Sequence, residues 1–383
     1  PCTTVSSVVS FVANTRFVMA WIVAAVFLAG CGPTPPAVFE VNLEGRDRAK
    51  ITRTEVEAIR ETMAGLFGTP DEPELPEAAG LDAQRLARAA GRAVGDQRGR
   101  HWGLYRRHCA ACHGLAGNGA GPRAALFEPY PTDLRQGRFK YTSTRDGGKP
   151  TRADIKRTLI EGVPNTTMPS FARLADDDID AMVEYVVYLS LRGESEIAVA
   201  QLVLDEHEYL PLDRDMVRDE AVEPFVERWT EADSLAVAEV EAARAAPPVE
   251  TPEQWAASID RGRRLFVENR SQCIQCHGSN GDGDGEDKEL YDDWNKPKKG
   301  VSTAQTEALA QRFTLPLQRL RARNFHQGVF RGGDRPIDVY WRIHVGIKGT
   351  PMPSSGPDAA TEGVFSPDEI WDVVYYVLSL SDN

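Results

Sequence analysis

The chain has 383 residues, of which 42% are hydrophobic, so it has room for two or three globular domains and is not disordered throughout. Its 44 lysines and arginines stand against 57 aspartates and glutamates, which gives a formal net charge of -13 at pH 7. This acidic balance argues against nucleic acid as a partner and favours basic surfaces on other proteins.

An apolar segment stands near the N-terminus. Residues 17–30 read FVMAWIVAAVFLAG and lie between Arg16 and Cys31. The segment is short for a membrane span and typical of the core of a signal peptide. Residues 28–31, Leu-Ala-Gly-Cys, resemble the bacterial lipobox, in which the cysteine is lipidated and becomes the new N-terminus. We therefore expect a lipoprotein signal peptide over residues 1–30, with an ordinary signal peptide or an uncleaved anchor as alternatives.

This segment predicts where the mature chain lies. We expect the extracytoplasmic (periplasmic) face of the bacterial cytoplasmic membrane, with lipidated Cys31 as the anchor. Residues 31–98 are expected to form a proline-rich tether and a helical N-terminal region. Thr52 and Glu55 have the spacing of a capping box, and Gly68 is a typical helix stop. Met63 lies on the apolar face of that helix and is interpreted as a core residue.

One cysteine motif occurs twice, as Cys109-Ala110-Ala111-Cys112-His113 and as Cys273-Ile274-Gln275-Cys276-His277. C-x-x-C-H is the attachment signature of a c-type haem. Positions i, i+3 and i+4 share one face of a helix, so both thiols can reach one porphyrin while the imidazole lies under its iron. We expect two covalently bound haem c groups. A zinc site is the alternative, because C-x-x-C is also half of a tetrahedral zinc motif.

The roles of these residues follow from the motif. Attachment is assigned to the thiols of Cys109, Cys112, Cys273 and Cys276, and axial ligation of iron to His113 and His277.

An internal repeat indicates the second axial ligand of each iron. Residues 162–169, GVPNTTMP, match residues 346–353, GIKGTPMP, with Gly, Thr, Met and Pro in register. Met168 and Met352 are therefore the expected sixth ligands. The match extends to residues 133–139 with 324–330 and to residues 179–190 with 370–381, which argues against coincidence.

The last pair of repeated segments predicts amphipathic helices. Asp176 is a candidate cap for the first of them. Ser366 and Glu369 predict a capping box for the second, with Pro367 in its first turn.

These motifs, in this order, resemble class I c-type cytochromes, in particular their diheme members. The resemblance covers residues 99–193 and 255–383. It implies an all-α fold of two tandem cytochrome c-like haem domains, in each of which the first and last helices cross and the haem lies in a crevice. It also implies His and Met as axial ligands. Residues 194–254, which are rich in acidic side chains, are expected to form a helical linker between the domains.

The second domain departs from the family pattern. The loop after His113 ends in Pro122, and in the family a proline carbonyl often accepts the N–H of the proximal histidine. The loop after His277 has no such proline, so the hydrogen-bond partner of that imidazole stays open. Residues 280–286 also fit the start of a calcium loop, although Tyr291 stands where the bidentate Glu is needed.

Two further features of the second domain leave alternatives. An insertion over residues 286–322 contains Trp294 and the cluster Lys296, Lys298 and Lys299, and it is either a solvated loop or a partner-docking element. His344 is close enough to Met352 in sequence to compete for the second iron.

The resemblance implies an electron carrier that passes single electrons between extracytoplasmic respiratory partners and has no catalytic residues. The partners would be an oxidase, a quinol-oxidising complex or a dehydrogenase. A diheme peroxidase or a thiosulfate-oxidising enzyme is the rival, because catalysis at iron needs an open sixth position. A permanent subunit of a respiratory complex is a third interpretation.

Overall fold

The computed structural model describes residues 37–43, 50–75, 80–145, 147–205, 210–296, 315–358 and 360–382. The expected signal peptide, Cys31, His207, Lys298 and Lys299 lie outside these residues. The chain divides into a short unit that ends at Ala37 and one compact unit over residues 38–383. Within the described ranges no helix is long and apolar enough to cross a membrane. The described part is mostly helical, with one two-stranded sheet, so the all-α expectation is confirmed.

Helix α2 (Arg53–Phe67) precedes the first haem motif and packs on the later helix α7 (Asp176–Leu204). The predicted capping box is present, because Thr52 and Glu55 exchange hydrogen bonds, and the helix ends before Gly68. Met63 is fully buried on the apolar face, as expected of a core residue. The hydroxyl of Tyr188 on α7 donates to the carbonyl of Phe67, which fixes the end of α2.

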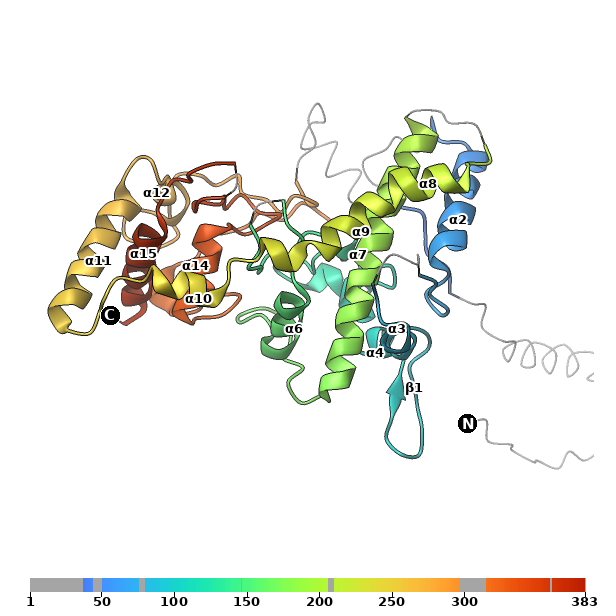
Figure 1. Cartoon of the computed structure of the whole chain (residues 1–383), viewed down its shortest axis with the longest axis horizontal. Coiled ribbons are helices and arrows are strands. Elements are labelled where there is room, and N and C mark those ends of the chain that lie inside the picture. Colours follow the sequence, from blue (N-terminus) through green and yellow to red (C-terminus); the bar gives the residue numbers. More distant parts are fainter. Residues whose placement is uncertain are drawn as a thin grey trace, which may run out of the picture. The chain divides into compact units, whose positions relative to one another are not determined.

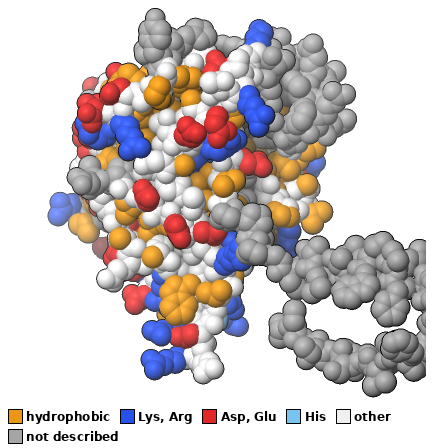
Figure 2. All heavy atoms as spheres, turned by 90° about the vertical axis from the view of Figure 1, so that its right-hand side faces the viewer, with side chains coloured by type: hydrophobic (Ala, Val, Ile, Leu, Met, Phe, Trp, Pro, Cys, Tyr) orange, Lys and Arg blue, Asp and Glu red, His pale blue; other side chains and the backbone are white. Residues whose placement is uncertain are grey.

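A hairpin follows helix α3 (Ala83–Ala89). Its strands β1 (Val94–Gly95) and β2 (His101–Trp102) pair antiparallel, and they were not predicted from the sequence. Figure 2 shows Lys and Arg side chains at the lower end of the molecule, over this hairpin. Exposed arginines in and beside the hairpin are Arg92, Arg98 and Arg100.

The first haem domain is built on α7, the longest helix of the described chain (Figure 1). Before it come α4 (Leu104–His108), α5 (Ala110–His113), α6 (Arg152–Glu161) and the 3-10 turns η4 (Ala124–Leu126) and η5 (Leu134–Gln136). The N-cap of α7 is Ala175, so the expectation that Asp176 caps this helix is wrong. Asp176, Asp177 and Asp178 occupy the first turn instead, where negative charge is favourable to the helix dipole. The helix continues past residue 193 to Leu204, because Val199, Ala200 and Val203 are also buried.

The connection between the haem domains is a string of short helices: α8 (Arg214–Ala221), α9 (Glu223–Thr230), η6 (Ala232–Leu235) and α10 (Glu239–Arg244). Its first part packs on α7, where Trp229 donates to the buried carboxylate of Glu194, which also pairs with Lys149. Its last part packs on the second domain, where the indole of Trp371 donates to the carbonyl of Ala242 at 2.7 Å. The connection is therefore helical, as predicted, and its two ends are held by different domains.

The second haem domain contains α11 (Pro252–Val267), α12 (Cys273–His277), α14 (Pro336–His344), α15 (Pro367–Ser379) and the turns η7 (Phe325–Gln327) and η8 (Leu380–Asp382). Helices α11 and α15 lie against each other (Figure 1). A Cβ at Gly262 would overlap the carbonyl of Asp372, so glycine permits this close approach. The carboxylate of Asp372 in turn accepts from Arg261 at 2.6 and 2.8 Å. The capping box of Ser366 and Glu369 is present, with Pro367 at the first helical position.

Candidate haem sites

The two C-x-x-C-H motifs have the same local structure. Each is a single helical turn followed by a glycine with a positive φ, Gly114 or Gly278. A glycine-rich loop then closes on the turn: the amides of Gly121 and Gly285 donate to the carbonyls of Cys112 and Cys276 at 3.0 and 3.2 Å. Because this folding puts the two cysteines and the histidine of each motif on one turn, both sites have the local geometry that haem attachment requires.

The proximal histidines have equivalent hydrogen bonds. The Nδ1 of His113 lies 3.1 Å from the carbonyl oxygen of Thr132, and the Nδ1 of His277 lies 3.2 Å from that of Arg323. With Nδ1–H as the donor, Nε2 of each imidazole is left to face a metal. The expectation that a carbonyl of the Pro122 loop would bind His113 is therefore wrong, and the open partner of His277 is the carbonyl of Arg323.

Thr132 and Arg323 stand directly before a repeated turn. In it, Asp133 and Asn324 each accept a hydrogen bond from the amide two residues later, at 3.0 Å in both domains. This side-chain turn fixes the preceding carbonyl toward the imidazole. The match of residues 133–139 with 324–330 was visible in the sequence, and it was the available signal for both acceptors.

The two methionine loops also agree bond by bond. The hydroxyls of Thr166 and Thr350 donate to the carbonyls of Val163 and Ile347 at 2.8 and 2.7 Å. The amides of Met168 and Met352 donate to those hydroxyls at 3.1 and 3.3 Å. At Gly162 and Gly346, whose φ values are 70° and 71°, an added Cβ would lie 2.7 Å from the backbone of Pro169 or Pro353. The repeated Gly, Thr, Met and Pro thus build one rigid loop that presents a thioether.

Cys109, Cys112, His113 and Met168 line one cavity in the first domain. It encloses about 1200 Å³, part of which is open to solvent, and its remaining walls are mainly apolar and aromatic, including Leu134, Ile155, Leu159, Phe139 and Phe171. Burial raises the pKa of the Cys109 thiol to about 12, so the free thiol is neutral. The structure therefore brings together the residues expected to hold the first haem, and their donor set and apolar surroundings fit a covalently attached porphyrin.

An aromatic pair supports the haem motif in each domain. Tyr105 and Tyr185 have ring centroids 4.8 Å apart, and Phe266 and Tyr376 are 5.4 Å apart. Tyr185 and Tyr376 are equivalent in the repeat. The pairs join the helix before the cysteines to the last helix of each domain, which is the contact between first and last helices that the family resemblance implies.

His344 and the second glycine-rich loop are held by bonds within the protein. His344 is buried, with Nδ1 3.1 Å from the hydroxyl of Tyr340 and Nε2 3.0 Å from the carbonyl of Pro357, so both ring nitrogens are engaged. The loop of Gly281, Gly283 and Gly285 repeats the backbone bonds of its counterpart in the first domain. The described residues contain no group of three or more His, Cys, Asp or Glu side chains that could hold a metal ion.

The described part of the insertion binds the chain's own first domain. Lys140 forms an ion pair with the buried Asp292 at 2.8 Å and lies 4.9 Å from the ring centroid of Trp294. Arg138 pairs with Asp293 at 3.0 Å. The side chain of Gln318 also bridges the amide of Tyr130 and the carbonyl of Phe127. Asp292, Trp294 and Gln318 are therefore engaged within the protein, whereas residues 286–289 and Lys296 are exposed.

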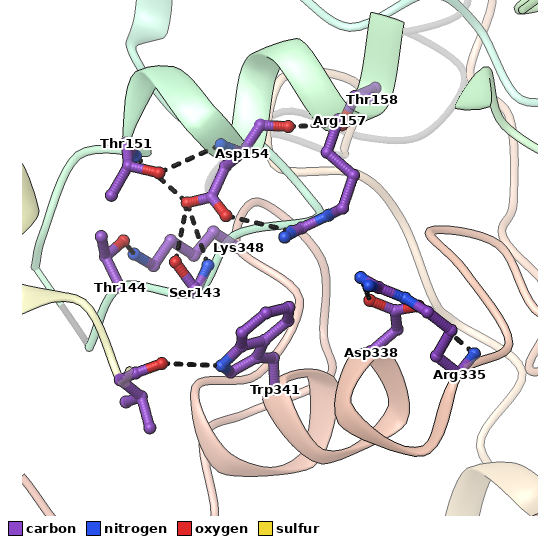
Figure 3. Close-up of polar contacts among 11 residues, drawn as sticks. Ser143, Thr144, Thr151, Asp154, Arg157, Thr158, Arg335, Asp338, Trp341 and Lys348 are labelled. Carbon is purple, nitrogen blue, oxygen red and sulfur yellow. Dashed lines mark hydrogen bonds and ion pairs between the residues drawn. The ribbon is translucent and has the colours of Figure 1, made fainter. Parts of the chain in front are cut away.

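Equivalent residues of the two domains meet at the junction. Arg157 on α6 lies over the ring of Trp341 on α14, and Asp154 and Asp338 occupy matching positions in the two helices (Figure 3). Lys348, in the second methionine loop, donates to the hydroxyl of Thr144 at 2.7 Å and to the carbonyl of Gly148 at 2.8 Å. The two domains are therefore in direct contact, through the equivalent residues Arg157 and Trp341 and through Lys348.

Comparison with known proteins agrees with this description. The family model of cytochrome c matches residues 103–190 and 259–381, more than half of the chain, so the chain belongs to the cytochrome c family. Cytochrome c domains imply covalently bound haem c. No curated protein sequence gives a significant match. Among solved structures, the chain is similar to one chain of the reducing HAO-like protein complex of Kuenenia stuttgartiensis, with 27% identity, a TM-score of 0.49, and coverage of 73% of this chain and 94% of that chain.

Proposed function

We propose that the protein is a diheme c-type cytochrome that transfers single electrons between extracytoplasmic redox partners. The observation that carries this proposal is the methionine loop, which has the same hydrogen bonds in both domains. A thioether held on a rigid loop opposite each histidine would close the sixth position of each iron. An iron whose six coordination positions are all filled can exchange electrons but does not bind a substrate.

The chain's own residues have three tasks in this proposal. Cys109, Cys112, Cys273 and Cys276 would fix the two haems covalently. His113 and His277 would bind iron through Nε2, oriented by the carbonyls of Thr132 and Arg323. Met168 and Met352 would supply a thioether ligand to each iron. The haem, when bound, supplies the one-electron chemistry, and apolar walls such as Leu134 and Phe171 would exclude water from it.

The packing of the two domains supports a relay within one chain. Lys140 and Tyr141 line the first cavity and also contact the second domain, at Asp292 and Gly332 respectively. Lys348 stands four residues before Met352 and is bonded to the first domain. The surroundings of the two haems would therefore be in direct contact. An electron could then pass from one haem to the other within the chain, with no separate carrier between them.

The location and partners belong to the same proposal. An anchor at Cys31 would keep the protein at the outer face of the cytoplasmic membrane. Transient docking to an oxidase, a quinol-oxidising complex or a dehydrogenase would supply and remove electrons, and such redox encounters use small interfaces.

A redox titration of the purified holoprotein, combined with turnover assays, tests the proposal. We expect two haems per chain, two one-electron couples, and no turnover of hydrogen peroxide or thiosulfate. Replacement of the buried Met63 by leucine is the control that leaves both couples unchanged. Rapid peroxide turnover by a high-spin iron in the unmodified protein would contradict the carrier and establish the enzyme interpretation instead.

A further inference from the structure

Two arginine side chains of the second domain present buried donors that have no partner. Nη1 of Arg323 and Nε of Arg331 are inaccessible to solvent and lack a hydrogen-bond acceptor within the described residues. Arg331 is nevertheless held in place, because its Nη2 donates to the carbonyl of Asn165 at 3.2 Å. A buried guanidinium N–H without an acceptor is costly, so these donors point to an anionic group that completes their surroundings.

The surroundings of Tyr141 also lack negative charge. Its electrostatic neighbours are Arg323, Arg331, Arg342 and a single carboxylate, Asp292. Asp292 is already paired with Lys140. In a chain with a net charge of -13, this local excess of partly buried positive charge favours a ligand with more than one carboxylate.

Arg323 and Arg331 belong to the second domain, but residues near them line the first haem cavity. Tyr141 and Lys140 line that cavity. Asn165, which accepts from Arg331, belongs to the loop of Met168, although Arg331 belongs to the second domain. The approach is close, because a Cβ at Gly332 would overlap the ring of Tyr141. Arg331 therefore reaches across the junction to the loop of Met168, which forms part of the first cavity.

We propose that Arg323 and Arg331 of the second domain bind the carboxylate groups of the haem in the first domain. A covalently attached porphyrin brings two carboxylates, which matches in number and charge the two guanidinium groups that each keep an unpartnered donor. The first haem site is thus completed by residues from the other half of the chain. This inference rests on the proposed presence of a haem in each domain.

The sign of the effect follows from electrostatics. Two cations beside the haem disfavour the more positive, oxidised iron and raise its reduction potential. Removal of one of them should shift the reduced-to-oxidised ratio of the first haem toward oxidation by about tenfold at fixed potential, which is about 59 mV for a one-electron couple. The second haem should shift by less.

The experiment measures both potentials by spectroelectrochemistry on the full-length holoprotein and on Arg331→Met, Arg323→Met and Arg331→Lys. The first haem is identified as the one whose spectrum changes in Met168→Ala. We expect both methionine variants to lower the potential of that haem and Arg331→Lys to restore most of it. The matched control is Arg335→Met, which removes the same charge from the same domain at a side chain that is half exposed to solvent and is paired with Asp338.

Unchanged potentials in both methionine variants, or an equal shift in Arg335→Met, would overturn the inference. If a methionine variant does not fold, the unmodified protein still tests it: carboxylates held by arginine titrate below their ordinary range, so the potential of the first haem should be constant between about pH 5.5 and 8. A pH-dependent potential in that interval would contradict the proposal. A haem count of one per chain would instead refute the proposed function on which it rests.

Discussion

Arg157 and Trp341 occupy the same position in the two haem domains, and they contact each other. Each residue stands five positions before the glycine of its methionine loop, and the guanidinium of Arg157 lies 4.7 Å from the ring centroid of Trp341. The two repeats are therefore in direct contact through equivalent residues. The linker lies beside this contact, because the indole of Trp341 donates to the carbonyl of Val237.

Loss of the Trp341 side chain should uncouple the domains. Trp341 is buried, and its indole N–H donates to Val237 at 2.9 Å, so Trp341→Ala should lower the free energy of unfolding by about 3–5 kcal/mol. Calorimetry should then show two separated transitions. Trp255→Ala is the control, because Trp255 packs against Tyr375 within the second domain, with ring centroids 5.0 Å apart. A single, unshifted transition in Trp341→Ala would refute the coupling.

The contact of α11 with α15 depends on Gly262. An alanine methyl group there would overlap the backbone of Asp372, so Gly262→Ala should destabilise the second domain by more than about 2 kcal/mol. The matched control is Gly65→Ala in α2, where a Cβ would have an ordinary contact of 3.6 Å with Arg214. Helix propensity predicts that this control stabilises the protein by about 0.5–1 kcal/mol. Denaturant unfolding of both variants measures the difference, and equal effects would contradict the packing described.

The stability of the second domain should depend on pH through His344. Burial lowers the pKa of His344, so the unfolded chain binds a proton more readily than the folded one. Folding stability should therefore be complete above the unfolded pKa of about 6.5 and decrease as the pH falls below it. Thermal denaturation between pH 5 and 8 measures this slope. His344→Gln should flatten the slope, and an unchanged slope would assign the pH dependence to other groups.

The turn that follows Arg323, the acceptor of His277, can be weakened by a substitution that changes no expected iron ligand. In Asn324→Ala the amide of His326 loses its acceptor, which should cost about 0.5–2 kcal/mol and loosen the carbonyl of Arg323. A weaker hydrogen bond makes the imidazole a poorer electron donor, so the potential of the second haem should rise. Spectroelectrochemistry measures this rise. A rise confined to the first haem would contradict the assignment.

Much of the fold could be predicted because the sequence is a repeat. The cysteine motifs, the methionine loops and the last helices gave the order of elements in both domains, and capping residues gave the starts of α2 and α15. The acceptors of the proximal histidines were missed because they are main-chain carbonyls, which every residue has, so no residue type marks them in the sequence. The extension of α7 was missed because the expected boundary at residue 193 came from family length, whereas buried residues such as Val199 and Val203 continue the helix.

The junction could not be predicted because its contacts join residues far apart in sequence. Trp294 could be interpreted as a docking residue for a partner, since nothing in its neighbourhood indicates Lys140. The same holds for Arg331, whose side chain belongs to one domain by sequence and to the other by contact with Asn165. Periodicity and motifs determine local structure, but the pairing of two domains depends on complementary surfaces.

The most direct test of the two-haem carrier is optical spectroscopy of the oxidised protein and of Met168→Ala and Met352→Ala. We expect two low-spin haems in the unmodified protein and the loss of one thioether-to-iron band in each variant, with the other haem unchanged. The double variant should lose both bands. A high-spin haem in the unmodified protein, or a band that survives both substitutions, would show that these methionines do not close the irons and would contradict the proposed carrier.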